Sequence, residues 1–179
     1  MDFSQLLEER RSIRAFTKNT KISNEDIELI IYAAQQAPSW KNSQTGRYYA
    51  VTSSEAAEKF RNTCLPGFNA ERTENAAGFI VTAFKKGISG FTPNGDPADS
   101  NGNAWGAYDL GLQCQNLILK ARELGYDTLI MGLKDEEKIR ELLDIPMDEN
   151  IMSVIAIGKR EVTPEKPMRN SIKDILKTY

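Results

Sequence analysis

The side chains best suited to chemistry lie in two short polar segments, of which the first is Arg10–Arg14. This segment places three guanidinium groups and one serine hydroxyl within five residues. Guanidinium groups bind phosphate in bidentate geometry, and a serine adds one more donor without bulk. The segment therefore indicates a phosphate site. Considered alone, it is better explained as a solvated basic cap at the C-terminus of a helix, where the helix dipole favours positive charge.

The second segment, Pro38–Gln44, has the sequence PSWKNSQ and combines hydroxyl, amide and aromatic groups in one loop. Such groups can meet the donors and acceptors of a heterocyclic ligand such as a flavin without ionising. When the loop is considered alone, an ordinary polar connection between a helix and a strand, with Trp40 half-buried, explains it better. The interpretation depends on both segments occurring together.

The chain has no histidine. This excludes Ser-His-Asp and Cys-His nucleophile systems, His-ligated zinc and iron sites, and the commonest general acid and base. If the chain is an enzyme, we expect a cofactor to supply the chemistry. Cys64 and Cys114 are far apart in the sequence and match no paired spacing, so no metal site or disulfide is predicted, and we expect both to be small buried hydrophobes.

Length and composition indicate one soluble domain over residues 1–179, with 40% hydrophobic residues and a net charge of −2. The charge argues against a protein built to bind nucleic acid or a membrane surface. The sequence starts directly with an amphipathic pattern and shows no secretory signal, so we expect a cytoplasmic protein.

These segments must be positioned by an alternation of helices and strands. Asp2 is an N-cap candidate, and Gln5 occupies the capping-box position of an expected first helix. Ser23 precedes an apolar stripe that predicts a helix over about residues 24–36. Further helices are expected near Ser54, over 135–143, and as a turn from Ser171. Short charge-free runs predict strands at 48–52, 79–84, 128–131 and 151–157, which suggests α/β layering.

Residues 105–124 are apolar around nearly the whole helix, so we expect this helix to be buried on most sides. Within it, Trp105 and Tyr108 are interpreted as core or interface residues, and Asp109 as a carboxylate on the helix surface. Residues 85–103 are polar and rich in glycine, which predicts a long surface loop bordering a substrate site.

The two polar segments together resemble the opening of FMN-dependent nitroreductases. The resemblance rests on R-R-S-I-R-x-F at residues 10–16 and A-P-S-x-x-N-S-Q at 37–44. It continues through Asn69 and Arg72, Gln115–Asn116, Gly132 and the 166–169 tail, covering nearly the whole chain. It implies a three-layer α/β/α fold with a mixed, largely antiparallel central sheet, and a homodimer with composite active sites.

The resemblance also implies which residues bind FMN. The first basic motif would hold the phosphate, the Pro-Ser loop would reach the flavin from the opposite subunit, and a strand-end turn would face the reactive flavin nitrogen. Two polar side chains would lie near the ring oxygens, and a C-terminal basic pair would complete the phosphate pocket. The phosphate residues would be Arg10, Arg11, Ser12 and Arg14, and the loop residues Pro38, Ser39, Trp40, Asn42 and Gln44. The strand-end turn would be Met131 and Gly132, the side chains near the ring oxygens Asn69 and Arg72, and the C-terminal basic pair Lys166 and Arg169.

The activity implied is reduction of a nitroaromatic, quinone or similar small acceptor by NADH or NADPH, with ping-pong kinetics and no catalytic side-chain acid. Gln44-Thr45-Gly46 departs from the Gln-Pro-Trp of many relatives, which leaves the acceptor open. Alternatives are flavin reduction, BluB-like oxidative fragmentation of the flavin, a flavin-binding protein without turnover, and a phosphate-binding interaction module.

Overall fold

The structure, a computed structural model, describes all residues from 1 to 179. The helices are α1 (Phe3–Glu9), α2 (Asn24–Gln35), α3 (Ser54–Cys64), α4 (Gly67–Arg72), α5 (Ala104–Glu123), α6 (Glu136–Leu143) and α7 (Ile172–Ile175), with a short 3₁₀ turn, η1, at Trp40–Asn42. The strands are β1 (Gly46–Val51), β2 (Gly78–Lys85), β3 (Asp127–Met131) and β4 (Glu149–Gly158).

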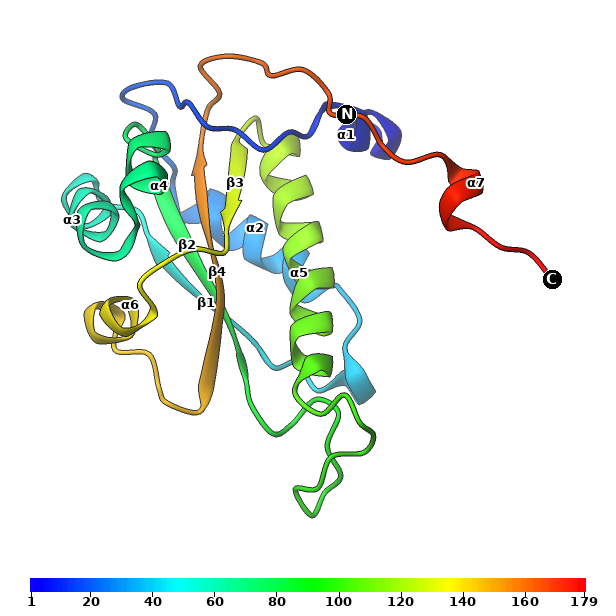
Figure 1. The fold of residues 1–179 in the computed structure, drawn as a ribbon. Coiled ribbons are helices and arrows are strands. Elements are labelled where there is room, and N and C mark those ends of the chain that lie inside the picture. The colour runs from blue at the N-terminus through cyan, green and yellow to red at the C-terminus, as the bar shows by residue number, and fades with distance from the viewer.

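The four strands form one sheet in the order β1-β2-β4-β3, and every neighbouring pair is antiparallel. The only parallel pairing is an isolated bridge between Ser12 and Thr128. Helices α2 and α5 cover one face of the sheet, while α3, α4 and α6 lie on the other (Figure 1). The predicted three-layer, largely antiparallel fold is therefore confirmed.

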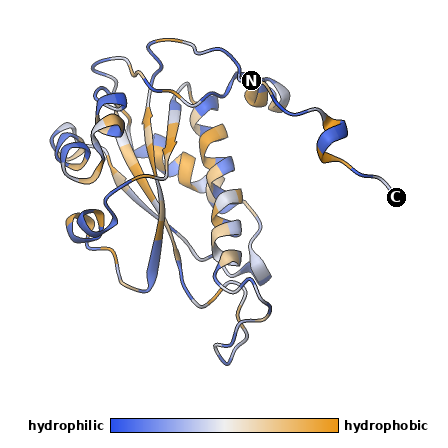
Figure 2. Ribbon diagram, viewed as in Figure 1, coloured by the Kyte–Doolittle hydropathy of each residue, from blue (hydrophilic) through white to orange (hydrophobic).

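Strand β2 supplies both hydrophobic cores, because successive side chains of a strand point to opposite faces. Phe79 and Val81 belong to the core under α3 and α6, whereas Ile80 and Phe84 belong to the core under α2 and α5. This explains why β2 contains no charge before Lys85. Figure 2 shows the apolar residues concentrated in the strands and in the helices packed on them.

Local signals fix most of the helix starts. Both hydrogen bonds of the Asp2–Gln5 capping box are present, and the Ser23 side chain accepts from the backbone N–H of Asp26 at the start of α2. Helix α4 was not predicted, because Pro66 at its N-cap offers no side-chain acceptor and the helix has only six residues. Both cysteines are free and buried, as expected.

Residues 161–179 leave the sheet after β4 and run past α1 away from the rest of the molecule (Figure 1). Every residue of this C-terminal arm is exposed. Its short helix α7 carries Ile172 and Ile175, which are 65% and 67% exposed. None of the helices combines the length and apolar character needed to cross a membrane.

Candidate functional site

The first basic motif and the C-terminal arm enclose a small cavity of about 140 Å³, called here the phosphate cradle. Its lining is polar and contains no hydrophobic residue. The lining residues are Arg10, Arg11, Ser12, Arg14, Pro164, Glu165, Pro167 and Arg169. The structure thus brings together two segments that are about 150 positions apart in the sequence.

The four arginines of the cradle make no ion pair with any carboxylate. Burial, together with the neighbouring charges of Arg11 and Arg169, lowers the pKa of Arg10. The Nε atom of Arg11 is buried without a hydrogen-bond partner. An anion with several acceptor oxygens would relieve both the repulsion and the missing hydrogen bond, and a phosphate group has this chemistry.

The first basic motif is positioned by an alternation of exposed and buried side chains along its backbone. The backbone N–H of Ile13 donates to the carbonyl oxygen of Thr128 in β3 at 3.0 Å, and the Ile13 side chain is 1% exposed. Ser12 and Arg14, on either side of Ile13, are exposed. Burial of one apolar residue therefore directs the polar side chains on both sides of it outward.

The two basic residues expected at the C-terminus are separated in the structure. Arg169 lines the cradle, and its Nη1 atom donates to the backbone carbonyls of Pro167 and Met168 at 3.1 and 3.2 Å. Lys166 lies outside the cradle and forms an ion pair with Glu8 of α1. Arg169 is thus placed to bind an anion, whereas the charge of Lys166 is already neutralised.

The loop Pro38–Gln44 has a strained backbone. Lys41, Asn42 and Gln44 have φ angles of 46°, 56° and 50°, a region that L residues rarely adopt. Such strain is concentrated at functional sites, because surrounding structure must hold it in place. Pro38, at the start of this loop, is exposed. The Ser39 side chain caps no N–H group of η1 and instead accepts the backbone N–H of Gln44 at 3.1 Å.

The same loop, together with Thr45 directly after it, holds most of the unsatisfied polar side-chain atoms of the molecule. Three buried atoms have no hydrogen-bond partner here: Trp40 Nε1, Ser43 Oγ and Thr45 Oγ1. Buried polar groups are nearly always hydrogen-bonded, so each exception calls for an explanation. A ligand or a second protein chain at this loop would provide one.

Asp109 holds this loop, although the sequence interpretation placed it on the helix surface. That interpretation was wrong, since Asp109 is 2% exposed. Its Oδ2 atom accepts the backbone N–H of Trp40 at 3.0 Å and the hydroxyl of Ser89 at 2.5 Å. The ring of Trp40 also lies 4.7 Å from that of Trp105, centroid to centroid. Tyr108, expected in a core or interface, is 60% exposed in this chain.

A third group of expected residues lies where β3 ends. The buried side chain of Asn69 donates to the carbonyl oxygen of Leu133 at 2.9 Å, which ties α4 to the turn at Gly132. Met131 is 3% exposed, and the space where a Cβ of Gly132 would lie is open. Arg72 stacks on Phe68, 5.3 Å from the ring centroid, and makes no hydrogen bond to this turn. Asn69 and Gly132 are thus brought together, and Arg72 is not.

The cradle and the Pro38–Gln44 loop lie at opposite ends of α5. At one end Arg122 contacts Glu9, next to the cradle, and at the other Asp109 contacts Trp40. Asp109 and Arg122 are 13 positions apart, which is about 20 Å along a helix axis. One chain therefore does not bring its two polar segments together.

The profile of the Nitroreductase family matches residues 7–159. The chain belongs to the nitroreductase family. It is 32% identical, over 83% of this chain and 80% of the relative, to a protein of Archaeoglobus fulgidus named as a candidate NADH dehydrogenase/NAD(P)H nitroreductase. It is 27% identical to the oxygen-insensitive NADPH nitroreductase of Helicobacter acinonychis, over 87% of this chain and 86% of the relative.

Solved structures agree with this membership of the nitroreductase family. A nitroreductase-like protein of Exiguobacterium sibiricum, solved in complex with FMN, superposes with a TM-score of 0.85 at 26% identity, covering 100% of this chain and 98% of that one. A structure described as an NAD(P)H:FMN oxidoreductase from Staphylococcus epidermidis gives a TM-score of 0.85 at 25% identity, covering 99% and 96%.

Proposed function

We propose that this nitroreductase-family chain is an FMN-dependent oxidoreductase that uses NADH or NADPH to reduce nitroaromatic, quinone or similar small acceptors. Family membership supports the class of reaction. The observation that carries the cofactor proposal is the cradle, where four arginines gather around about 140 Å³ without a paired carboxylate. The relatives named above as NAD(P)H nitroreductases and as FMN-bound structures support the same assignment.

The residues present fit FMN in two places. Arg10, Arg11, Ser12, Arg14 and Arg169 would hold the phosphate, because they offer unpaired guanidinium donors and a hydroxyl in one small polar cavity. Strand β3 leads from this cradle to the turn at Gly132, where Met131, Gly132 and Asn69 would border the ring. FMN held there would supply hydride and electron transfer between a nicotinamide and the acceptor. The two substrates would use the same pocket in turn, which would give ping-pong kinetics.

No side chain of this chain is assigned a proton-transfer role. With no histidine in the sequence, binding and electrostatic stabilisation remain as the tasks of the protein. The cradle arginines would anchor the anionic end of the cofactor. The strained Pro38–Gln44 loop would present its unsatisfied donors to the cofactor or its surroundings.

We further propose a homodimer whose sites are composite, each combining the cradle of one protomer with Ser39, Trp40 and Asn42 of the partner. Three features support it. The two segments are about 20 Å apart along α5 in one chain. Trp40 Nε1, Ser43 Oγ and Thr45 Oγ1 lack partners. The exposed C-terminal arm carries apolar side chains that a second chain would cover.

A visible spectrum of the purified protein, recorded with FMN and then after adding NADH, tests the cofactor and the reaction together. We expect a bound flavin band that NADH bleaches and a nitroaromatic or quinone restores. A protein that binds no flavin would contradict the proposal and favour a phosphate-binding module. Bound flavin that neither nicotinamide reduces would instead indicate a protein without turnover.

A further inference from the structure

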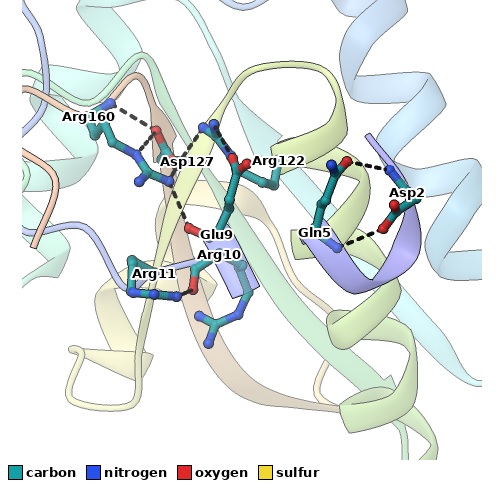
Figure 3. A network of polar contacts seen from close by, with 8 residues as sticks. All are labelled: Asp2, Gln5, Glu9, Arg10, Arg11, Arg122, Asp127 and Arg160. Atoms are coloured by element: carbon teal, nitrogen blue, oxygen red, sulfur yellow. Dashed lines mark hydrogen bonds and ion pairs between the residues drawn. The ribbon is translucent and has the colours of Figure 1, made fainter. Parts of the chain in front are cut away.

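An ion-pair network lies next to Arg10 and Arg11 of the phosphate cradle (Figure 3). Its centre is Asp127, the first residue of β3, which is 4% exposed. The Nε and backbone N–H groups of Arg160 donate to Asp127 Oδ2 at 2.9 and 3.1 Å, and Arg160 Nη2 donates to Oδ1. Arg122 Nη1 donates to Oδ1 at 3.2 Å. One carboxylate therefore holds two guanidinium groups from different elements.

Both arginines also reach the end of α1. Arg122 Nη2 forms an ion pair with Glu9 Oε2 at 3.2 Å, and Arg160 Nη2 donates to the Glu9 carbonyl oxygen at 3.2 Å. Glu9 is the last residue of α1, and the next residue is Arg10 of the cradle. The network thus fixes the backbone immediately before the cradle.

The other end of the same segment is fixed by the residue after Asp127. Thr128 accepts the backbone N–H of Ile13 at 3.0 Å and forms the parallel bridge with Ser12. Asp127 and Thr128 therefore hold both ends of the stretch from Glu9 to Ile13. This arrangement sets the path of the backbone that carries Arg10, Arg11 and Ser12.

The network also divides the arginines into two sets. Arg122 and Arg160 are paired with Asp127 and Glu9, and the hydrogen bond to Asp127 raises the pKa of Arg160. The cradle arginines have no carboxylate partner, as described above. The paired arginines support the backbone, and the unpaired ones remain free to bind an anion.

We propose that Asp127 is a positioning residue for the phosphate end of the flavin, acting through Arg122, Arg160 and Glu9. The inference rests on the proposed function, since it assumes that the cradle binds the FMN phosphate. It is specific to one end of the cofactor. Riboflavin lacks the phosphate, so the affinity for riboflavin does not depend on the geometry of the cradle.

The affinity ratio between FMN and riboflavin therefore separates positioning from general stability. The full-length protein, freed of flavin, is titrated with each flavin and binding is followed by quenching of flavin fluorescence. For Asp127→Asn we expect FMN affinity to fall by about tenfold. Mutating a residue that only orients the direct ligands of a metal lowers metal affinity by about 10- to 100-fold, and we expect the lower end of that range here. Riboflavin affinity should stay unchanged. Glu9→Gln should lower the same ratio by a smaller factor.

Two variants make the test robust. The Glu9 side chain is 48% exposed, so Glu9→Gln keeps the proposal testable even if Asp127→Asn fails to fold. Glu149→Gln is the matched control, because Glu149 is also a buried carboxylate, paired with Arg47 at 3.8 Å and accepting the Tyr49 hydroxyl at 2.6 Å. It lies at the end of β4 away from Asp127. Any effect of this variant should fall equally on both flavins.

The outcomes are distinct. If Asp127 acted by charge alone, removing a negative charge beside the cradle would raise FMN affinity, and that result would overturn the proposal. Equal losses for FMN and riboflavin, or no change in either, would overturn it as well. If the unmodified protein binds riboflavin as tightly as FMN, it is the proposed phosphate cradle that fails, independently of Asp127.

Discussion

The backbone N–H of Trp40 and the hydroxyl of Ser89 both donate to one oxygen of Asp109, at 3.0 and 2.5 Å. Trp40 belongs to the strained Pro38–Gln44 loop, and Ser89 to the long loop that follows β2. Asp109 is buried in α5, and its carboxylate accepts one hydrogen bond from each loop. It therefore fixes two loops from different parts of the chain. The loop proposed to contact the flavin and the loop expected to border the acceptor are thus mechanically connected.

We predict that Asp109→Asn loosens both loops. An amide keeps the size of the carboxylate but loses its charge, so the free energy of unfolding should fall by roughly 1–3 kcal/mol, the cost of a buried group left poorly paired. Urea unfolding measures this change. Ser89→Ala removes only one of the two donors and should cost less. Equal stability of the Asp109→Asn variant and the unmodified protein would contradict the prediction.

Substitutions of arginines that line the cradle should weaken FMN binding more than a substitution of the basic residue outside it. Arg10→Ala, Arg14→Ala and Arg169→Ala each remove a donor that can form charge-assisted hydrogen bonds, worth roughly 1.5–3 kcal/mol. Lys166→Ala should have a smaller effect, because Lys166 is paired with Glu8 outside the cradle. Isothermal titration with FMN measures all four. Unchanged affinity in the Arg10 and Arg14 variants would remove both from the site.

Shortening the tip of the loop between β2 and α5 should change which acceptors are reduced. Phe91 and Pro97 bridge the base of this tip. Removing residues 93–95 keeps Thr92 and Asp96 as a two-residue turn between them, which should preserve the Ser89 contact to Asp109 and the Asp99 contact to Trp105. Long polar loops of this kind often serve as lids or binding loops. Steady-state kinetics with several quinones and nitroaromatics test this. An unaltered acceptor profile and unaltered nicotinamide kinetics in a folded variant would show that the tip is only surface.

Composite sites predict that two inactive variants restore activity when mixed. Arg14→Ala damages the cradle and Asn42→Ala damages the loop from the partner. In a mixed dimer, one site then collects both defects and the other has neither, so part of the activity should return after subunit exchange. The experiment requires that each parent variant is folded, dimeric and inactive. Verified exchange without recovery would mean that each site takes both residues from one chain.

The sequence by itself determined most elements of the fold. Ser23 before the apolar stripe of α2, the Asp2–Gln5 capping box and the uncharged run of β2 each depend on residues within a few positions, so local patterns were sufficient. The two polar segments were also visible, because their residue types and spacing are local. Helix α4 lacked a capping side chain and was therefore missed.

Tertiary structure alone decided what each polar residue does. Arg169 lines the cradle while Lys166 is neutralised by Glu8, and no local pattern distinguishes these two basic residues. Likewise Asp109 and Asp127 have ordinary sequence neighbours, yet packing buries both and gives them partners from distant segments. A side chain's burial and partners depend on which elements meet in space, so they follow from the long-range packing of α5, β3 and β4 and not from spacing along the chain.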